Sequence, residues 1–239
     1  MMSLLYLFVG YGIYLKIKIF YERNQLNLIS FLIYDIIIIE NKKKGKIMKT
    51  ALIKITKNEK ESSGYADIFT KDDEKAITDI YFQWKKLNLD IQSLNSRRVN
   101  LPEIISEGLA CITMNLVRTN NTHFSNIGST SFDCLSPDTG ITYQIKAVST
   151  LTEKEYGGPT SFGPRSEADK IILLHFICEL DRVDFYLCDE NIDEIMVNKK
   201  ETFKQQCETG RRPRFSLLKK LKEKGIKPNL TWYFGENND

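Results

Sequence analysis

Segment 131–149, SFDCLSPDTGITYQIKAVS, constrains the fold of this chain more than any other stretch. Its centre, PDTG at 137–140, predicts a tight turn, because proline presets φ early in a turn and glycine supplies the positive φ late. Strand-like residues flank the turn, so the segment is expected to form a β-hairpin. A turn centred within PDTG pairs Asp133 with Gln144 in antiparallel register and carries Lys146 two residues further along the same strand.

These three polar side chains are expected to share one face of the hairpin. Gln144 and Lys146 do so because strand side chains alternate with a period of two, and directly opposed residues of two strands lie on the same face. The intervening residues are expected to point the other way, into a core: Phe132, Cys134, Ile145 and Ala147. An acid, an amide and a lysine therefore converge on one patch.

An acid on one strand followed by [E/Q]-x-K on the next is typical of metal-dependent phosphodiester cleavage. Asp133 and the amide oxygen of Gln144 are suitable ligands for Mg²⁺, and Lys146 can position or deprotonate the attacking water and offset phosphate charge. Glutamine leaves the site one negative charge short of the usual acid pair, which Glu107 could restore. Glu107 could equally be a solvated or cap-supporting carboxylate. The pattern alone fits a surface hairpin with a solvated lysine as well as it fits a nuclease.

Cysteine and histidine usage excludes other kinds of site. The five cysteines are odd in number and show no CxxC spacing, which argues against a disulfide framework and a structural zinc site and favours a reducing cytoplasm. Only His123 and His175 are present, too few for a histidine-rich metal site. His175 lies within the apolar run IILLHFI and is expected to be a core histidine.

Residues 1–47 differ in composition from the rest of the chain. Their apolar runs are shorter than the roughly 18 residues that a spanning helix needs. The peptide NKKKGKI before Met48 would be encoded by a purine-rich stretch, as a ribosome-binding site is. We therefore expect translation to start at Met48, residues 1–47 to be a non-native or disordered upstream extension, and residues 48–239 to form a single domain with no membrane partner. The alternative is a real membrane-associated N-terminal segment.

Charge is unevenly distributed along the chain, although the net charge is only +3. Seven basic and three acidic residues lie in 1–47, which leaves 27 basic and 28 acidic residues in the near-neutral body 48–239. Within that body, residues 201–228 contain nine basic and three acidic residues. This basic segment is expected to contact a polyanion.

The remaining patterns predict helices before the hairpin and strands after it. Helical spacing of apolar residues predicts a helix over 73–88, capped by Thr70 or Asp72, and a second from an Asn100 cap through Arg118. Strand-like runs cover 170–177 and 182–187, and a basic helix is expected over 215–224. This order indicates an α/β (α+β) domain with a central sheet flanked by helices.

Four motifs resemble a small family of bacterial type II restriction endonucleases that read 5′-GCNGC-3′, within the PD-(D/E)XK nuclease superfamily. They are LPEIISEGLACI, SFDCLSPDTGITYQIKA, TSFGPRSEADKIILLHF and TFKQQCETGRRPRFS. The resemblance implies a restriction-endonuclease-like central mixed sheet and a homodimer cutting both strands of a two-fold symmetric site with Mg²⁺. By position it makes Asp133 the metal-binding acid, Gln144 the second metal ligand and Lys146 the catalytic lysine.

DNA contacts are expected from arginines, which suit both phosphates and guanine edges. The candidates are Arg165, in the loop after the hairpin, and Arg211, Arg212 and Arg214 in the motif GRRPR. The partners implied are double-stranded DNA and, genetically, a cognate DNA methyltransferase. Two other functions stay open from the residues: a repair or mobile-element nuclease, and a DNA-binding module that no longer cleaves.

Overall fold

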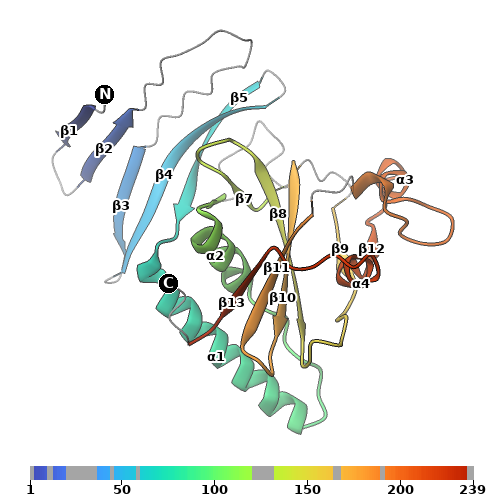
Figure 1. The fold of residues 1–239 in the computed structure, drawn as a ribbon. Coiled ribbons are helices and arrows are strands. Elements are labelled where there is room, and N and C mark those ends of the chain that lie inside the picture. Colours follow the sequence, from blue (N-terminus) through green and yellow to red (C-terminus); the bar gives the residue numbers. More distant parts are fainter. Residues whose placement is uncertain are drawn as a thin grey trace.

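A computed structural model describes residues 3–9, 13–19, 37–43, 46–57, 60–119, 132–163, 168–188 and 192–235. It has three layers: a large twisted sheet, two helices on one face, and two short helices with a small second sheet on the other (Figure 1). The predicted class, a mixed sheet flanked by helices, is confirmed.

The main sheet has nine strands. Their order across it is β13 (Leu230–Tyr233), β11 (Arg182–Cys188), β10 (Lys170–Ile177), β8 (Thr142–Thr150), β7 (Cys134–Leu135), β6 (Val117–Thr119), β5 (Lys60–Ile68), β4 (Lys46–Lys57) and β3 (Ile37–Lys43). β8 and β10 pair in parallel and the other described neighbours pair antiparallel, so the sheet is mixed. A separate pair is formed by β1 (Ser3–Val9) and β2 (Ile13–Ile19). That 1–47 is an upstream extension stays a prediction.

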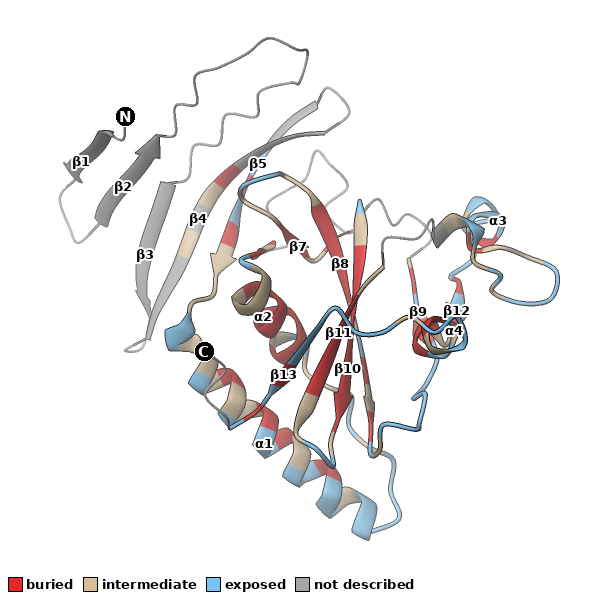
Figure 2. Cartoon of the chain, in the orientation of Figure 1, coloured by how far each residue is buried: buried red, intermediate tan, exposed pale blue. Residues whose placement is uncertain are grey.

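Strand β10 lies at the centre of the core and is covered on both faces. Its alternate residues Ile172, Leu174 and Phe176 face one helix layer. Ile171 and Leu173 face the other. This explains the nearly continuous apolar sequence of the strand, which is typical of a parallel strand buried on both sides (Figure 2).

Helices α1 (Lys71–Ser93) and α2 (Glu103–Met114) cover the first face. α1 begins in a capping box between Thr70 and Asp73, so Thr70 is the N-cap and not Asp72, the other predicted candidate. The helix runs five residues beyond the predicted end at 88. Within the described residues, no helix has the length and apolar character needed to cross a bilayer.

The predicted bounds of α2 are wrong at both ends. Its N-cap is Pro102, not Asn100, whose carbonyl instead accepts a hydrogen bond of 3.1 Å from Trp84 Nε1. Its last residue is Met114, because Asn115 adopts a left-handed conformation (φ 52°) that ends the helix. Arg118, predicted to be helical, therefore lies in strand β6.

The second face is covered by a layer built around three aromatic rings. It contains α3 (Phe203–Glu208), α4 (Leu217–Glu223), the 3₁₀ turn η1 (Ile192–Glu194) and a two-stranded sheet of β9 (Thr160–Ser161) and β12 (Arg214–Phe215). Phe162, Phe203 and Phe215 pack together and against β8 and β10. This layer holds much of the predicted basic segment.

His175 is a core histidine, as predicted, with no exposed surface. Its Nε2 lies 2.7 Å from the Thr150 hydroxyl. That hydroxyl donates to the Thr152 carbonyl at 2.8 Å, so Nε2 must be the donor in its contact with Thr150. Burial, together with the charges of Lys222 and Arg182, lowers the pKa of His175 to about 4.

We therefore expect His175 to make folding sensitive to acid. Unfolding restores a pKa near 6.5, so below that pH the unfolded state binds a proton that the folded state does not, and stability falls as the pH drops towards 4. Between pH 7 and pH 5 the loss should be about 2 kcal/mol. Urea unfolding of wild type and His175→Gln at both pH values checks this. Equal pH dependence in the two proteins would contradict it.

Candidate active site

The hairpin has the predicted turn and register. Ser136 N–H donates to the Ile141 carbonyl at 2.9 Å across the loop 137–140, and Gly140 has a φ of 68°. Cys134 pairs with Tyr143 and Leu135 with Thr142, a register that continues to Asp133 and Gln144.

Asp133 is fixed at the point where β7 begins. Its carboxylate Oδ2 accepts a hydrogen bond of 2.7 Å from the Ile145 N–H of β8, and its own N–H donates to the Tyr143 carbonyl at 2.9 Å. On the other side, the Thr119 N–H donates to the Asp133 carbonyl at 2.9 Å. The carboxylate is therefore held against β8 between the two residues of the Q-x-K motif.

Gln144 and Lys146 lie on one face of β8 and differ in exposure. Gln144 is buried, whereas Lys146 is half-buried. The Lys146 ammonium lies 5.4 Å from the centroid of the Phe162 ring. Of the four residues predicted to point into the core, Phe132, Cys134 and Ile145 are buried, but Ala147 is exposed, so the prediction is wrong for Ala147.

α2 and β6 bring further charges to the site. The Glu107 carboxylate, on a residue 9% exposed, forms an ion pair of 2.5 Å with Arg118 Nε. One carboxylate oxygen of Glu107 is therefore paired with the Arg118 guanidinium, and the other oxygen takes no part in this ion pair. Arg118 and Glu103, both close enough to influence the site electrostatically, were not predicted as site residues. The spacing of four between Glu103 and Glu107 on one helix was the available signal for Glu103.

The pKa values of this cluster show how closely its members interact. Burial raises the pKa of Glu107 to about 7, with Asp133 and Glu103 adding to the rise and Arg118 opposing it. Burial also raises the pKa of Asp133, against the Ile145 N–H and the Lys146 charge. The pKa of Lys146 is lowered by burial, against the attraction of Asp133, Glu103 and Glu107.

The donor set fits a hard cation held by few protein ligands. Across the part of the chain that the structure describes, no group of three or more His, Cys, Asp or Glu side chains could hold a metal ion. A carboxylate from Asp133 and an amide oxygen from Gln144 are nevertheless the ligand types that suit Mg²⁺, which keeps several of its waters and is often bound through only one or two carboxylates. Any protein site here would therefore be an open one.

The predicted arginines differ in their surroundings. Arg165 lies outside the described residues. The guanidinium of Arg211 forms two hydrogen bonds with the Glu201 carboxylate and one with the Thr209 hydroxyl. Arg212 and Arg214 are exposed on either side of buried Pro213.

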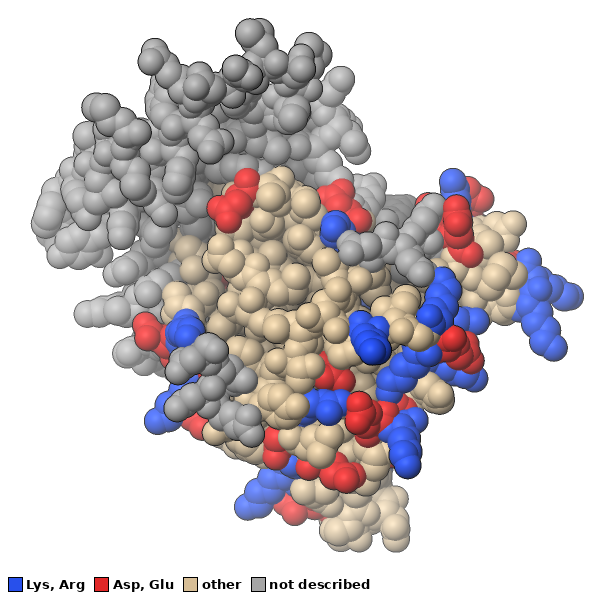
Figure 3. Space-filling view, in the orientation of Figure 1, with Lys and Arg blue, Asp and Glu red and all other residues tan. Residues whose placement is uncertain are grey.

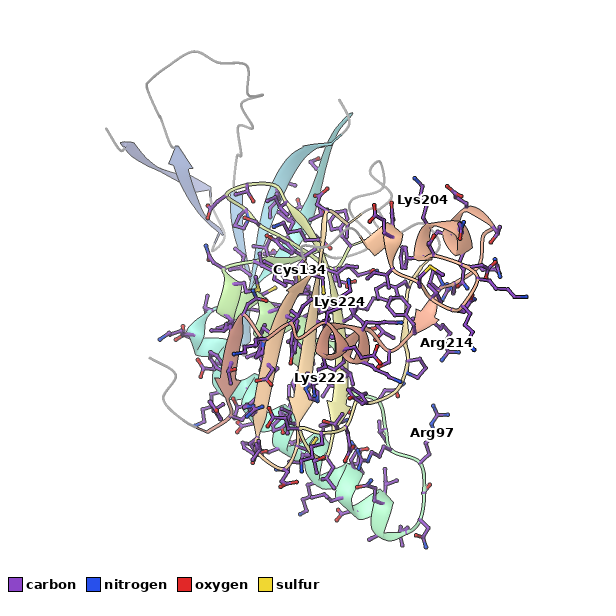
Figure 4. All side chains as sticks on the ribbon, turned by 45° about the vertical axis from the view of Figure 1, so that its right-hand side comes forward. Arg97, Cys134, Lys204, Arg214, Lys222 and Lys224 are labelled. Atoms are coloured by element: carbon purple, nitrogen blue, oxygen red, sulfur yellow. The ribbon has the colours of Figure 1, made fainter. Side chains whose placement is uncertain are left out.

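Lysines and arginines gather over the layer of α3 and α4, on the right of Figure 3. In Figure 4, Arg214 and Lys204 project outward from this layer.

The comparison with protein families decides the class of this chain. A family model described as Bsp6I restriction endonuclease matches residues 69–224, well over half of the chain. The chain belongs to the Bsp6I restriction endonuclease family. It is 34% identical over 157 residues to the type II restriction enzyme Bsp6I of Bacillus sp. (strain RFL6), covering 63% of this chain and 83% of that protein. No solved structure matches the chain.

Membership in the Bsp6I family confirms that the protein is a type II restriction endonuclease, a site-specific nuclease. The matched region extends from the start of α1 to the end of α4. It includes the hairpin, α2 and the basic layer, but not β1–β5 or β13.

Proposed function

We propose that this restriction endonuclease is a Mg²⁺-dependent member of the PD-(D/E)XK superfamily. It makes double-strand cuts at GCNGC, acts as a homodimer and is accompanied by a cognate methyltransferase. The observation that carries the proposal is the hydrogen bond from the Ile145 N–H to Asp133, because it fixes an acid beside the Q-x-K motif of β8. The recognition sequence rests on the resemblance of the four motifs.

Asp133 and Gln144 would hold the metal, and Glu107 would add negative charge nearby. Mg²⁺, when bound, polarises the phosphate and favours ionisation of a water ligand. The Asp133 carboxylate is already oriented by its hydrogen bond from the Ile145 N–H, which leaves its other oxygen outside that bond. Lys146 would orient the attacking water and offset the charge that develops on the phosphate.

Digestion of plasmid DNA with and without Mg²⁺ tests this function. We expect discrete fragments only with Mg²⁺, whose sequenced ends all fall at GCNGC. Smearing or structure-dependent nicking would instead indicate a repair or mobile-element nuclease. Binding without cutting would support a non-cleaving module, for which the glutamine at 144 is the best argument.

Gln144→Glu should lower the Mg²⁺ requirement of cleavage. A second carboxylate adds attraction for the cation, and about 1.4 kcal/mol corresponds to a tenfold lower half-saturating concentration. Gln144→Leu, which has no oxygen, should raise that concentration. Cleavage rates across a Mg²⁺ titration measure both shifts. If neither variant changes the Mg²⁺ dependence, Gln144 is not a metal ligand.

The basic layer is proposed to contact DNA phosphates through Arg212 and Arg214. Neutralising both as glutamine should weaken binding to any duplex and reduce the slope of log K against log salt by about 2. Arg211→Gln serves as the matched control, because its guanidinium is already bonded to Glu201. Fluorescence anisotropy at several salt concentrations gives the slopes. An unchanged slope in the double variant would remove these arginines from the interface.

A further inference from the structure

The end of the Lys146 side chain rests on an aromatic ring from the opposite layer. Its ammonium lies 5.4 Å from the centroid of Phe162, within the roughly 6 Å at which a cation is attracted to a ring face. Within the described residues, Lys146 makes no hydrogen bond or ion pair. A lysine has a flexible four-carbon stem, so contact with this ring restricts where its charge lies.

Phe162 is itself held rigidly. Its side chain is 1% exposed. It stacks on Phe215 with ring centroids 5.3 Å apart and an interplanar angle of 17°, and it meets Phe203 edge to face, also at 5.3 Å. Its N–H donates to the Pro213 carbonyl at 3.0 Å, next to β12. The ring therefore cannot move without disturbing the layer that carries the basic segment.

We propose that Phe162 is a positioning residue for Lys146, a role that rests on the function proposed above. The ring attracts the ammonium from the side of the basic layer. Asp133, Glu103 and Glu107 attract it from the side of the hairpin and α2. Between these two attractions the lysine is kept extended beside Asp133 instead of turning towards solvent.

This role also connects DNA contact to catalysis. Phe215 and Pro213, which pack on or bond to Phe162, belong to the same segment as Arg212 and Arg214. A duplex bound to this segment would therefore contact the same stretch of chain that supports the Phe162 ring under Lys146.

Phe162→Leu tests the proposal, with Phe203→Leu as the matched control. Both remove one ring from the same cluster, but only Phe162 lies under Lys146. We expect single-turnover cleavage to slow roughly 3- to 10-fold in Phe162→Leu and less than about 2-fold in Phe203→Leu. DNA affinity in Ca²⁺ should not change in either. Phe162→Tyr, which keeps the ring face, should restore the rate. Equal slowing by the two leucine variants, or no recovery with tyrosine, would overturn the proposal.

A spectroscopic measurement tests the contact without relying on cleavage. Protons above a ring face are shifted upfield, so the ε-methylene of Lys146, assigned with Lys146→Arg in protein carrying ¹³C at the lysine ε-carbon, should resonate upfield of the other lysines. The shift should vanish in Phe162→Leu and persist in Phe203→Leu. An unshifted wild-type resonance would refute the contact. An upfield shift in a protein that fails to cut with Mg²⁺ would instead locate the error in the proposed function.

Discussion

The Asp133→Asn variant should lose at least about 10³-fold in single-turnover cleavage, the largest effect expected of any single change. Losing the carboxylate removes the main protein charge that would hold Mg²⁺, and a bound metal contributes several kcal/mol to stabilising the transition state. Asparagine keeps a side-chain oxygen that can still accept from the Ile145 N–H, so the hairpin should fold. Rapid-quench measurements on a plasmid substrate give the rate, and thermal unfolding verifies the fold.

Asp169 provides a matched control for this variant. Its Oδ2 accepts hydrogen bonds from the Thr142 N–H at 2.8 Å and the Thr142 hydroxyl at 2.7 Å, so it too is a carboxylate bonded to the backbone of β8. Asp169→Asn makes the same change of charge outside the cluster and should cut within a fewfold of wild type. If Asp133→Asn cut as well as Asp169→Asn did, Asp133 would not be the metal-binding acid.

Lys146→Ala should slow cleavage by roughly 10²- to 10⁴-fold while leaving DNA affinity almost unchanged. The ammonium acts on the reacting water and on charge that appears only in the transition state, so its loss affects the rate and not ground-state binding. Single-turnover rates and affinities in Ca²⁺ separate the two effects. Lys146→Arg keeps the charge but not the geometry and should recover only part of the rate.

Lys222 is the corresponding control for the lysine. It also lies over an aromatic ring, 5.7 Å from the centroid of Tyr156, but it is in α4 and bonds to the Glu153 carbonyl. Lys222→Ala should therefore leave the rate within a fewfold of wild type. Equal losses in both lysine variants would mean that cleavage reports a general effect on charge or folding.

Local chemistry made the hairpin predictable from sequence. The PDTG turn sets the register through proline and glycine alone, and this register places Asp133 beside the Q-x-K motif. The apolar run at 170–177 likewise predicts a strand, because burial on both faces leaves polar residues only at Lys170, where the strand begins, and at His175. The predicted resemblance to type II restriction endonucleases was also confirmed, at the level of the Bsp6I family.

The rest of the site depends on contacts between distant segments. The apolar spacing of α2 continues past Met114, but Asn115 turns the chain and pairing with β7 makes Arg118 a strand residue. Its ion pair with Glu107 follows from that change and could not be predicted. Phe162 directly follows β9, which pairs with β12 over only two residues, and so short a pairing leaves no periodicity to detect.

Whether Asp133 and Lys146 form one catalytic centre is tested most directly by the cleavage rate of the double variant Asp133→Asn/Lys146→Ala beside its two single variants. Residues that act as one catalytic unit are strongly non-additive. We expect the double variant to cut about as fast as the slower single variant, with Mg²⁺ in excess. Losses that multiply instead, by about 10⁵-fold or more, would show that the two residues act independently and that this hairpin is not a single catalytic centre.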